Sequence, residues 1–179
     1  MTRHPNCKAV IITQSASVNK SSQQFRLVGV GGTFDVLHRG HRRLLRKAFS
    51  VGTLVMIGLT SDSFARNLHK PHKVDPYSIR KEGLEKLLSK WGLLSRVKIM
   101  ELTDRHGLTV GSRRIQALVV SKRTSKTAFE INKRRKANGL KPLAIIPIDL
   151  ILAEDNRPIS STRIRRGQID REGRLVSSR

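Results

Sequence analysis

Two histidines, His38 and His41, follow a glycine-rich turn and open the strongly basic segment HRGHRRLLRK. Their spacing of three residues places both imidazoles on one face of the helix that we expect to begin there. The start of a helix also carries unpaired N–H groups and a partial positive charge. The pair therefore predicts a cradle for phosphate groups. Two ordinary surface histidines are the alternative, which Gly40 between them disfavours. A metal site would need further ligands at suitable spacing, and the sequence offers no convincing set.

Gly29, Gly31 and Gly32 precede the histidines in the stretch GVGGTFDVLH. Glycines at such a turn let a ligand approach the backbone without a side chain in the way. A tight turn with unusual backbone angles is the simpler alternative. Phe34 stands where the last glycine of the dinucleotide fingerprint G-x-G-x-x-G would be, and no Walker A lysine follows. The stretch therefore disfavours both of those nucleotide-binding loops.

A second polar cluster lies near the C-terminus, in the stretch ISSTRIRRG at residues 159–167. Its hydroxyl residues are Ser160, Ser161 and Thr162, and its cations are Arg163, Arg165 and Arg166. The hydroxyl residues are suited to cap the start of a final helix. Hydroxyls, helix-start amides and guanidinium groups are also the donors that bind a polyphosphate. An ordinary capped helix with a basic exposed face is the alternative.

Buried strands and amphipathic helices alternate along the chain from Phe25. The apolar runs predict strands at 25–32, 53–59, 96–102, 115–121 and 143–152. The periodic segments predict helices at 40–49, 77–91 and 125–139 and a final helix starting within 154–170. We expect helix 77–91 to bury Ile79, Leu84, Leu87, Leu88 and Trp91. This alternation predicts an α/β fold: a single Rossmann-like domain with an open parallel sheet of about five strands flanked by helices.

The domain limits follow from composition. Residues 1–24 are polar and rich in serine and predict a flexible N-terminal extension. The periodic part predicts one domain over residues 25–170, followed by a basic C-terminal tail at 171–179. Parallel sheets bind ligands beyond the carboxyl ends of their strands, where strand order reverses. The glycine and histidine stretch follows the first predicted strand and suits such a site.

The net charge of the chain indicates which classes of partner it can attract. The formal net charge is +23, from 36 lysines and arginines against 13 acidic residues. Such a chain attracts polyanions at low salt, so we expect non-specific binding of nucleic acid under that condition only. A generally basic surface composition is the alternative. Aromatic residues make up only 4% of the chain, which disfavours a reader of single-stranded RNA that stacks bases on aromatic rings.

The cellular compartment is suggested by what the sequence lacks. One cysteine, Cys7, cannot form an internal disulfide and is typical of a reducing compartment. No apolar run approaches the roughly 18 residues of a membrane helix, and the N-terminus has no secretory signal. We therefore expect a cytoplasmic protein without a membrane partner.

The two clusters together resemble the paired signatures, GGTFDVLHRGH and ISSTRIR, of the nucleotidyltransferase superfamily that includes the class I aminoacyl-tRNA synthetases. The stretches YSIRKEGLEKLL, ALVVS, INKRRKANGLKPL and IDLILAEDNRPISSTRIRRGQID narrow the resemblance. They are similar to the phosphopantetheine adenylyltransferases of the archaeal and eukaryotic type, over about Arg26 to Asp170. The last stretch is the most specific because it is long and nearly uninterrupted.

The resemblance implies a reaction of coenzyme A biosynthesis. Enzymes of this family transfer AMP from ATP to 4'-phosphopantetheine and give dephospho-coenzyme A and pyrophosphate. The acceptor phosphate attacks in line, so positioning and charge stabilisation supply the acceleration. Mg²⁺ is expected on ATP, held by substrate and water rather than by protein side chains. Feedback binding of coenzyme A is a further expectation.

The resemblance also implies roles for individual residues. His38 matches the histidine that contacts the phosphate where charge develops, and His41 matches one that holds the triphosphate. Gly31, Gly32 and Phe34 would line the nucleotide with backbone. Ser160, Ser161, Thr162 and Arg163 match the signature that grips the β- and γ-phosphates, and Arg165 is expected to join them. Thr33 matches a hydroxyl residue near the acceptor phosphate, and either Lys70 or Lys73 would help to hold that acceptor.

Two stretches depart from the family pattern. Residues 103–116 are less acidic than expected, and Lys122 and Arg123 stand where an acidic pair is usual. Both stretches follow predicted strands, close to the expected acceptor site. Three alternatives for function therefore stay open: cytidylyl transfer, adenylyl transfer to another phosphorylated acceptor such as FMN, and a basic RNA-binding protein on the same fold.

Overall fold

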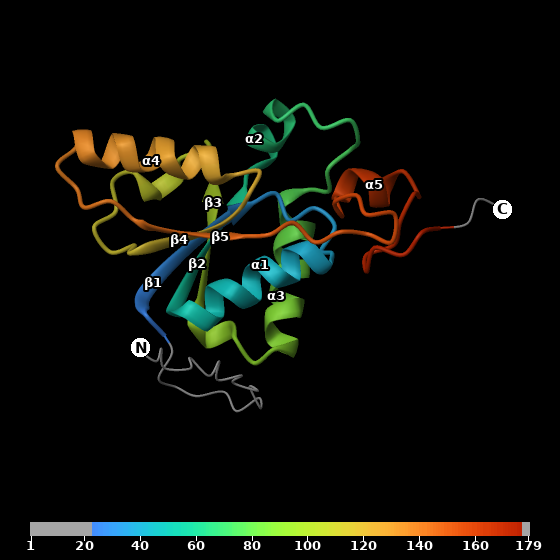
Figure 1. Ribbon diagram of the computed structural model, residues 1–179, viewed down its shortest axis with the longest axis horizontal. Coiled ribbons are helices and arrows are strands. Elements are labelled where there is room, and N and C mark those ends of the chain that lie inside the picture. Colours follow the sequence, from blue (N-terminus) through green and yellow to red (C-terminus); the bar gives the residue numbers. More distant parts are fainter. Residues whose placement is uncertain (1–22, 177–179) are drawn as a thin grey trace, which may run out of the picture.

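Residues 23–176, the part of the chain that this computed structural model describes, fold around one parallel sheet (Figure 1). Its strands are β1 (Phe25–Gly32), β2 (Gly52–Thr60), β3 (Val97–Leu102), β4 (Ala117–Ser121) and β5 (Ala144–Ile148). They lie in the order β3-β2-β1-β4-β5, and every neighbouring pair is parallel. The predicted α/β fold with about five parallel strands is confirmed. Because the strand order reverses at β1, a ligand crevice is expected at the carboxyl ends of β1 and β4.

Helices cover both faces of this sheet. They are α1 (Arg39–Val51), α2 (Asp62–Asn67), α3 (Tyr77–Lys90), α4 (Ser125–Ala137) and α5 (Ser161–Arg165), with short 3₁₀ turns η2 (Leu94–Arg96) and η3 (Gly107–Thr109). Figure 1 shows α1 and α3 on one face, α4 on the other, and α5 beside the start of α1. The larger core includes Val28, Leu45, Ile57, Leu84 and Leu88. A smaller core packs Leu118 against Ala128 and Ile131 of α4.

The helix starts follow the capping residues of the sequence. His38 caps α1 with extended backbone angles, and its Nδ1 accepts a hydrogen bond from Gly40 N at 3.1 Å. Ser61 and Ser160 cap α2 and α5 by accepting from the backbone N–H three residues on. The predicted capping role of Ser160 is confirmed. At both helix starts that the sequence marked as polar clusters, part of the N–H groups are already bonded: Arg39 N to Arg171 O and Gly40 N to His38 Nδ1 at α1, and Arg163 N to Ser160 Oγ at α5.

The buried face of α3 differs from the expected one. Ile79 is 53% exposed, so the prediction that it joins the core is wrong, whereas Arg80 is 1% exposed. Arg80 lies four and eight residues before Leu84 and Leu88 and shares their helix face. An arginine can occupy that face because backbone carbonyls and one carboxylate surround its guanidinium group.

Other element boundaries also differ from the expectation. The helix α2 lies in a stretch for which no helix was expected. β5 ends at Ile148 rather than at residue 152, and α5 is only five residues long. Beyond α5 the chain turns back on itself, with Ile169 paired to Leu175 in an antiparallel bridge.

Both ends of the predicted domain lie near the limits of the described residues. The proposed extension at 1–24 falls almost entirely outside them. At the other end, Arg171 O accepts from Arg39 N at 2.9 Å, and Glu172 forms an ion pair of 2.5 Å with Arg42. The segment 171–176 thus contacts α1. No helix within residues 23–176 is long and apolar enough to cross a membrane.

We expect the Leu84→Ala variant to lose about 2–5 kcal/mol of unfolding free energy, because Leu84 is fully buried. Ile79→Ala on the same helix should change it by less than about 0.5 kcal/mol. Urea unfolding of the two variants measures the difference. Similar losses in both would mean that the burial assigned to α3 is wrong.

Candidate active site

The segment from Thr33 to His41 connects β1 to α1 and forms the centre of the site. His38 and His41 stack with ring centroids 3.9 Å apart and an interplanar angle of 24°. The Phe34 ring lies 5.2 Å from the His41 ring, and the fully buried Phe34 has a positive φ of 48°. Such a conformation is unusual for a bulky residue and is held here by the packing of its ring.

Two glycines make room for these rings. A Cβ atom on Gly40 would lie 3.0 Å from Cε1 and 3.1 Å from Nδ1 of His38. A Cβ atom on Gly32 would lie 3.1 Å from the Phe34 ring. The glycine between the two histidines therefore allows the His38 ring to fold over the start of α1, which gives a physical reason for its place in the motif.

The hydrogen bonds of the pair fix its neutral tautomers. His38 Nδ1 accepts from Gly40 N, so in the neutral ring the proton is on Nε2. His41 Nδ1 lies 3.1 Å from Val36 O, and a carbonyl oxygen only accepts, so the His41 proton is on Nδ1. His38 therefore offers an N–H donor at Nε2, whereas His41 Nε2 carries no proton.

Burial keeps both rings uncharged. Burial, with added repulsion from His41, Arg42 and Lys70, lowers the pKa of His38 to about 3. Burial also lowers the pKa of His41 to about 4, with Lys70 and Arg42 acting in the same direction and the Val36 carbonyl opposing them. The free protein thus presents a neutral imidazole pair in a locally positive field at neutral pH.

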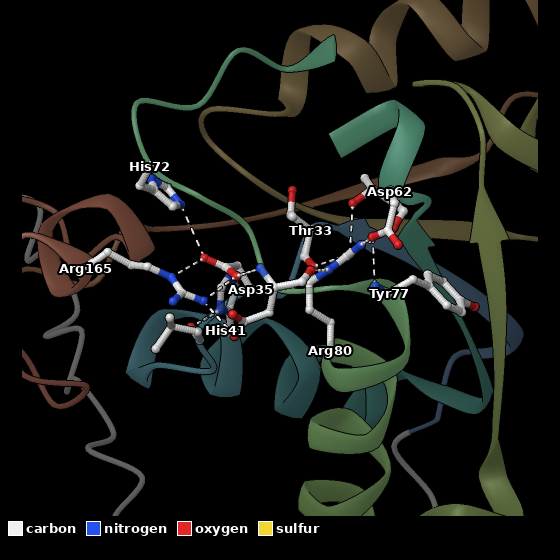
Figure 2. Close-up of polar contacts among 11 residues, drawn as sticks. Thr33, Asp35, His41, Asp62, His72, Tyr77, Arg80 and Arg165 are labelled. Atoms are coloured by element: carbon white, nitrogen blue, oxygen red, sulfur yellow. Dashed lines mark hydrogen bonds and ion pairs between the residues drawn. The ribbon is translucent and has the colours of Figure 1, made fainter. Parts of the chain in front are cut away.

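A buried carboxylate, Asp35, connects this segment to two distant parts of the chain (Figure 2). Its side chain is fully buried and accepts from Arg165 Nε at 3.0 Å and from Arg165 Nη2 at 2.8 Å. It also accepts from Asp75 N at 2.9 Å, and His72 Nε2 lies 3.2 Å from Oδ2. Burial raises the pKa of Asp35, but the bonds from Arg165 and Asp75 outweigh it and leave the pKa below its usual value.

Arg165 bonds to two carboxylates in this structure. Besides Asp35, its Nη2 lies 2.6 Å from Oδ2 of Asp75, and the two carboxylates raise the pKa of Arg165. This geometry brings the ISSTRIR stretch and the glycine and histidine stretch together, as a shared phosphate site requires. Its role in holding phosphate stays a prediction.

The rest of the second cluster lies at the start of α5. Ser160 Oγ accepts from Arg163 N at 3.3 Å, and Ser161 is buried while Thr162 is half-buried. Arg163 forms an ion pair of 2.5 Å with Asp155, and its Nη1 donates to Arg157 O and Pro158 O. These bonds join Arg163 to the loop that precedes α5. A phosphate contact from Arg163 stays a prediction and would compete with these bonds.

The structure distinguishes the two lysines proposed for the acceptor. Lys70 is half-buried, and burial lowers its pKa, partly opposed by Asp35. Its charge acts on both histidines of the pair. Lys73 is exposed. Lys70 is therefore the better-placed of the two for a ligand at the histidine pair.

An apolar cavity of about 440 Å³ lies between the sheet and α4. Its floor includes Gly29, Gly31 and Thr33 of the β1 strand and its continuation, and its opposite wall includes Ala128 and Ile131 of α4. Leu68 and Thr60 also line it, and one side is completed by Leu102, Arg105, His106, Leu108 and Thr109. The cavity therefore extends from the interior of the sheet to Thr33 and to the segment that carries Lys70.

Sequence reasoning missed two side chains that organise this site. Asp35 stands alone in GGTFDVLH, and only its position directly before the histidine stretch could have drawn attention to it. Arg80 was not among the residues expected to face the core, although its spacing from Leu84 and Leu88 is a core spacing. Asp62, which bonds to Arg80, and His72, whose Nε2 lies 3.2 Å from Asp35 Oδ2, carry no local signal in the sequence.

The described residues offer no cluster of three metal-ligating side chains. Asp35, whose charge acts on His41, and Asp75 both bond to Arg165. Lys70 and Arg42, whose charges also act on the pair, are nitrogen donors that suit phosphate oxygens. The expectation that Mg²⁺ arrives with ATP stays a prediction.

Comparison with known proteins places the chain among nucleotidyltransferases. A family described as cytidylyltransferase-like matches residues 30–167. Phosphopantetheine adenylyltransferase of Methanothermobacter thermautotrophicus is 47% identical over 154 residues, which cover 86% of this chain and 92% of the relative. The enzyme of the same name from Methanopyrus kandleri is 44% identical over 147 residues, 82% of this chain and 92% of that relative. A crystal structure of a protein of unknown function from Archaeoglobus fulgidus is 33% identical with a TM-score of 0.63, covering 68% of this chain and 88% of that one.

These matches cover most of the chain and nearly the whole length of the relatives. The chain belongs to the cytidylyltransferase-like family and, within it, to the phosphopantetheine adenylyltransferases.

The neutral state of His38 predicts an acid-dependent loss of stability. The pKa of a histidine is near 6.5 in the unfolded chain and that of His38 is about 3 in the folded protein. Between these values the unfolded chain binds the extra proton, so the free energy of unfolding falls as the pH drops through this range. His38→Gln should reduce this slope by up to about 1.4 kcal/mol per pH unit. Urea unfolding between pH 7.5 and 5 measures it, and an unchanged slope would contradict a buried neutral His38.

Proposed function

We propose that the chain transfers AMP from ATP to 4'-phosphopantetheine and releases dephospho-coenzyme A and pyrophosphate. One observation carries the proposal. The neutral pair His38 and His41 lies at the start of α1, where the charge of Lys70 acts on it, and Thr33 of the same connecting segment lines an apolar cavity of about 440 Å³. The histidine pair and Lys70 suit phosphate groups, and the apolar cavity suits a long uncharged arm that ends in a phosphate. The relatives at 44–47% identity bear the name of the same activity.

In this reaction an oxygen of the acceptor phosphate forms a bond to the α-phosphorus of ATP. The bond from that phosphorus to the oxygen bridging to the β-phosphate breaks, and pyrophosphate leaves with the electron pair. The chain supplies donors and positions for this exchange rather than a nucleophile. His38 Nε2–H is the donor for the α-phosphate, and the partial positive charge at the start of α1 adds to it.

His41 has a different part. Its Nδ1–H is held by Val36 O, and its Nε2 carries no proton in the free protein. A bound triphosphate raises the pKa of a neighbouring imidazole because opposite charge favours its protonated form. His41 therefore gains a proton as it grips the triphosphate and acts mainly in binding. The hydroxyl and guanidinium groups of Ser160, Ser161, Thr162, Arg163 and Arg165 hold the β- and γ-phosphates.

The acceptor occupies the cavity beside Thr33. Its pantetheine arm is a flexible chain of methyl, methylene and amide groups, which suits apolar walls interrupted by threonine hydroxyls. Its phosphate lies between Thr33 and Lys70. Gly31 lies on the cavity floor, and Gly32 and Phe34 bring the backbone to the nucleotide.

Four further features belong to the same proposal. Mg²⁺ enters with ATP as part of the substrate and is held by phosphate oxygens and water. Coenzyme A, the end product of the route, binds in feedback at the acceptor cavity. The enzyme works in the cytoplasm, and nucleic acid binds to it only at low salt through the excess of basic side chains.

The purified protein should release pyrophosphate from ATP only when 4'-phosphopantetheine and Mg²⁺ are both present. A coupled pyrophosphate assay across ATP, CTP and GTP, with phosphopantetheine, FMN or no acceptor, tests the substrates. Release from CTP would indicate cytidylyl transfer, and release with FMN would indicate another acceptor. No release with any combination, together with tight RNA binding at physiological salt, would favour the RNA-binding alternative.

His38→Ala should lower kcat by about 100- to 1,000-fold, because a preorganised donor to the developing charge is lost. His41→Ala should show a larger share of its loss in ATP affinity. Steady-state kinetics and calorimetry of ATP binding separate the two, with circular dichroism as a check of folding. If His38→Ala keeps more than about half of the wild-type kcat, the pair is not the catalytic centre.

A further inference from the structure

Arg80, at the start of α3, is a fully buried arginine that belongs to neither signature (Figure 2). Its Nη1 donates to Thr33 O at 3.0 Å and to Thr60 O at 2.8 Å, with Thr60 Oγ1 at 3.2 Å. Its Nε donates to Asp75 O at 2.7 Å, and its Nη2 donates to Asp62 Oδ1 at 2.8 Å. One guanidinium group thus binds the carboxyl ends of β1 and β2 and two points of the chain between β2 and α3.

Arg80 binds both ends of the segment 62–75, which connects β2 to α3. The segment begins with α2, carries Lys70, and returns to α3. Asp62 at its first position bonds to Arg80 Nη2 and also accepts from Tyr77 N at 2.8 Å. Asp75 at its last position bonds to Arg80 Nε through its carbonyl oxygen. Both ends of the segment are therefore set by the position of one side chain.

The same side chain also fixes Thr33. Thr33 lines the apolar cavity, and its carbonyl oxygen accepts from Arg80. The distance between Thr33 and the segment that carries Lys70 is thus set by two bonds to a single planar group. The returning end of the segment has a second anchor, because Asp75 N donates to Asp35 and His72 Nε2 lies 3.2 Å from Asp35 Oδ2.

We propose that Arg80 is a positioning residue for the acceptor phosphate: it holds Thr33 and Lys70 at the spacing that the phosphate requires, without contacting the substrate. The inference rests on the proposed function for the identity of the acceptor. Lysine cannot replace arginine here, because a single ammonium nitrogen cannot reach carbonyls on several sides in the planar fork geometry of a guanidinium group.

Arg96 provides a matched control. It donates to Thr53 O at 2.9 Å, to Phe49 O at 3.0 Å and to Gly52 O at 2.6 Å, at the amino end of β2. Its guanidinium carbon lies 5.6 Å from the Phe49 ring centroid, as that of Arg80 lies 5.8 Å from the ring centroid of Tyr77. The two arginines make the same kind of contact at opposite ends of one strand, so Arg96→Lys reports the stability effect alone.

The test compares Arg80→Lys with Arg96→Lys in the full-length protein. Arg80→Lys should lower kcat/KM for phosphopantetheine by up to about 100-fold, because a small displacement of a positioning contact has that effect. The affinity for ATP, measured by calorimetry, should stay within about twofold, since the histidine pair is not displaced. Hydrogen exchange should become faster within residues 62–75. Arg96→Lys should leave all three readouts at the wild-type value.

Asp62→Asn tests the same contact if Arg80→Lys does not fold. The asparagine keeps an oxygen acceptor for Tyr77 N but loses the charge that binds Arg80, so the same readouts should move in the same direction by a smaller factor. Kinetics and exchange rates that change no more than in Arg96→Lys would overturn the proposal and leave Arg80 a purely structural residue. Failure of the proposed function would be recognised separately, because the wild-type protein would then show no phosphopantetheine-dependent release of pyrophosphate.

Discussion

The ion pair between Asp35 and Arg165 is the contact on which the arrangement of the site depends. Asp35 is fully buried, so its charge is tolerated only because Arg165 binds it through two nitrogens and Asp75 N adds a third donor. The partners come from the start of α1, from the segment before α3 and from α5, which are up to 130 residues apart in sequence. Removal of Arg165 would leave the Asp35 charge buried without its cation, which is far more costly than the pair is stabilising. Arg165 would still pair with Asp75 if Asp35 were removed. The two signatures of the sequence are therefore one structural unit.

The excess of basic residues is partly explained by what the arginines bind. Arg80, Arg96 and Arg135 each donate to at least three backbone carbonyl groups, and Arg135 joins Thr109 O and Ser112 O to Lys141 O. Carbonyl oxygens at strand ends and in loops need donors when they are buried. Arg96 and Arg135 supply these donors to carbonyl groups alone, whereas Arg80 also pairs with Asp62. Contacts of the first kind add positive charge to the fold without a carboxylate to balance it.

The sequence was sufficient to predict the sheet, the three long helices and the polar clusters at two helix starts. These features depend on local patterns: apolar runs, periodic faces and capping hydroxyls. The sequence was not sufficient for Arg80 or Asp35, because their partners lie far along the chain. Arg80 bonds to Thr33 O, which is 47 residues away in the sequence. No residue of α3 indicates that buried carbonyl groups need a hydrogen-bond donor at this position. Ile79 was expected in the core because it is apolar. The next residue, Arg80, is the one with the helical spacing of the core residues Leu84 and Leu88. Residue types do not show where backbone carbonyl groups lie in the fold, so contacts of this kind can be found only from the structure.

The same positive surroundings explain why the imidazole pair is neutral and what an anion would change. Burial is the main cause of the low pKa values of His38 and His41, and Lys70 and Arg42 lower them further. An anion between these groups would offset the repulsion from the cations and raise both pKa values. His38 carries a proton on Nε2 without any such change, because Gly40 N occupies Nδ1. The only proton of neutral His41 is on Nδ1, where it bonds to Val36 O. The two histidines therefore differ in the ring nitrogen that carries the proton, through the backbone group that each one contacts, although the sequence presents them as an equivalent pair.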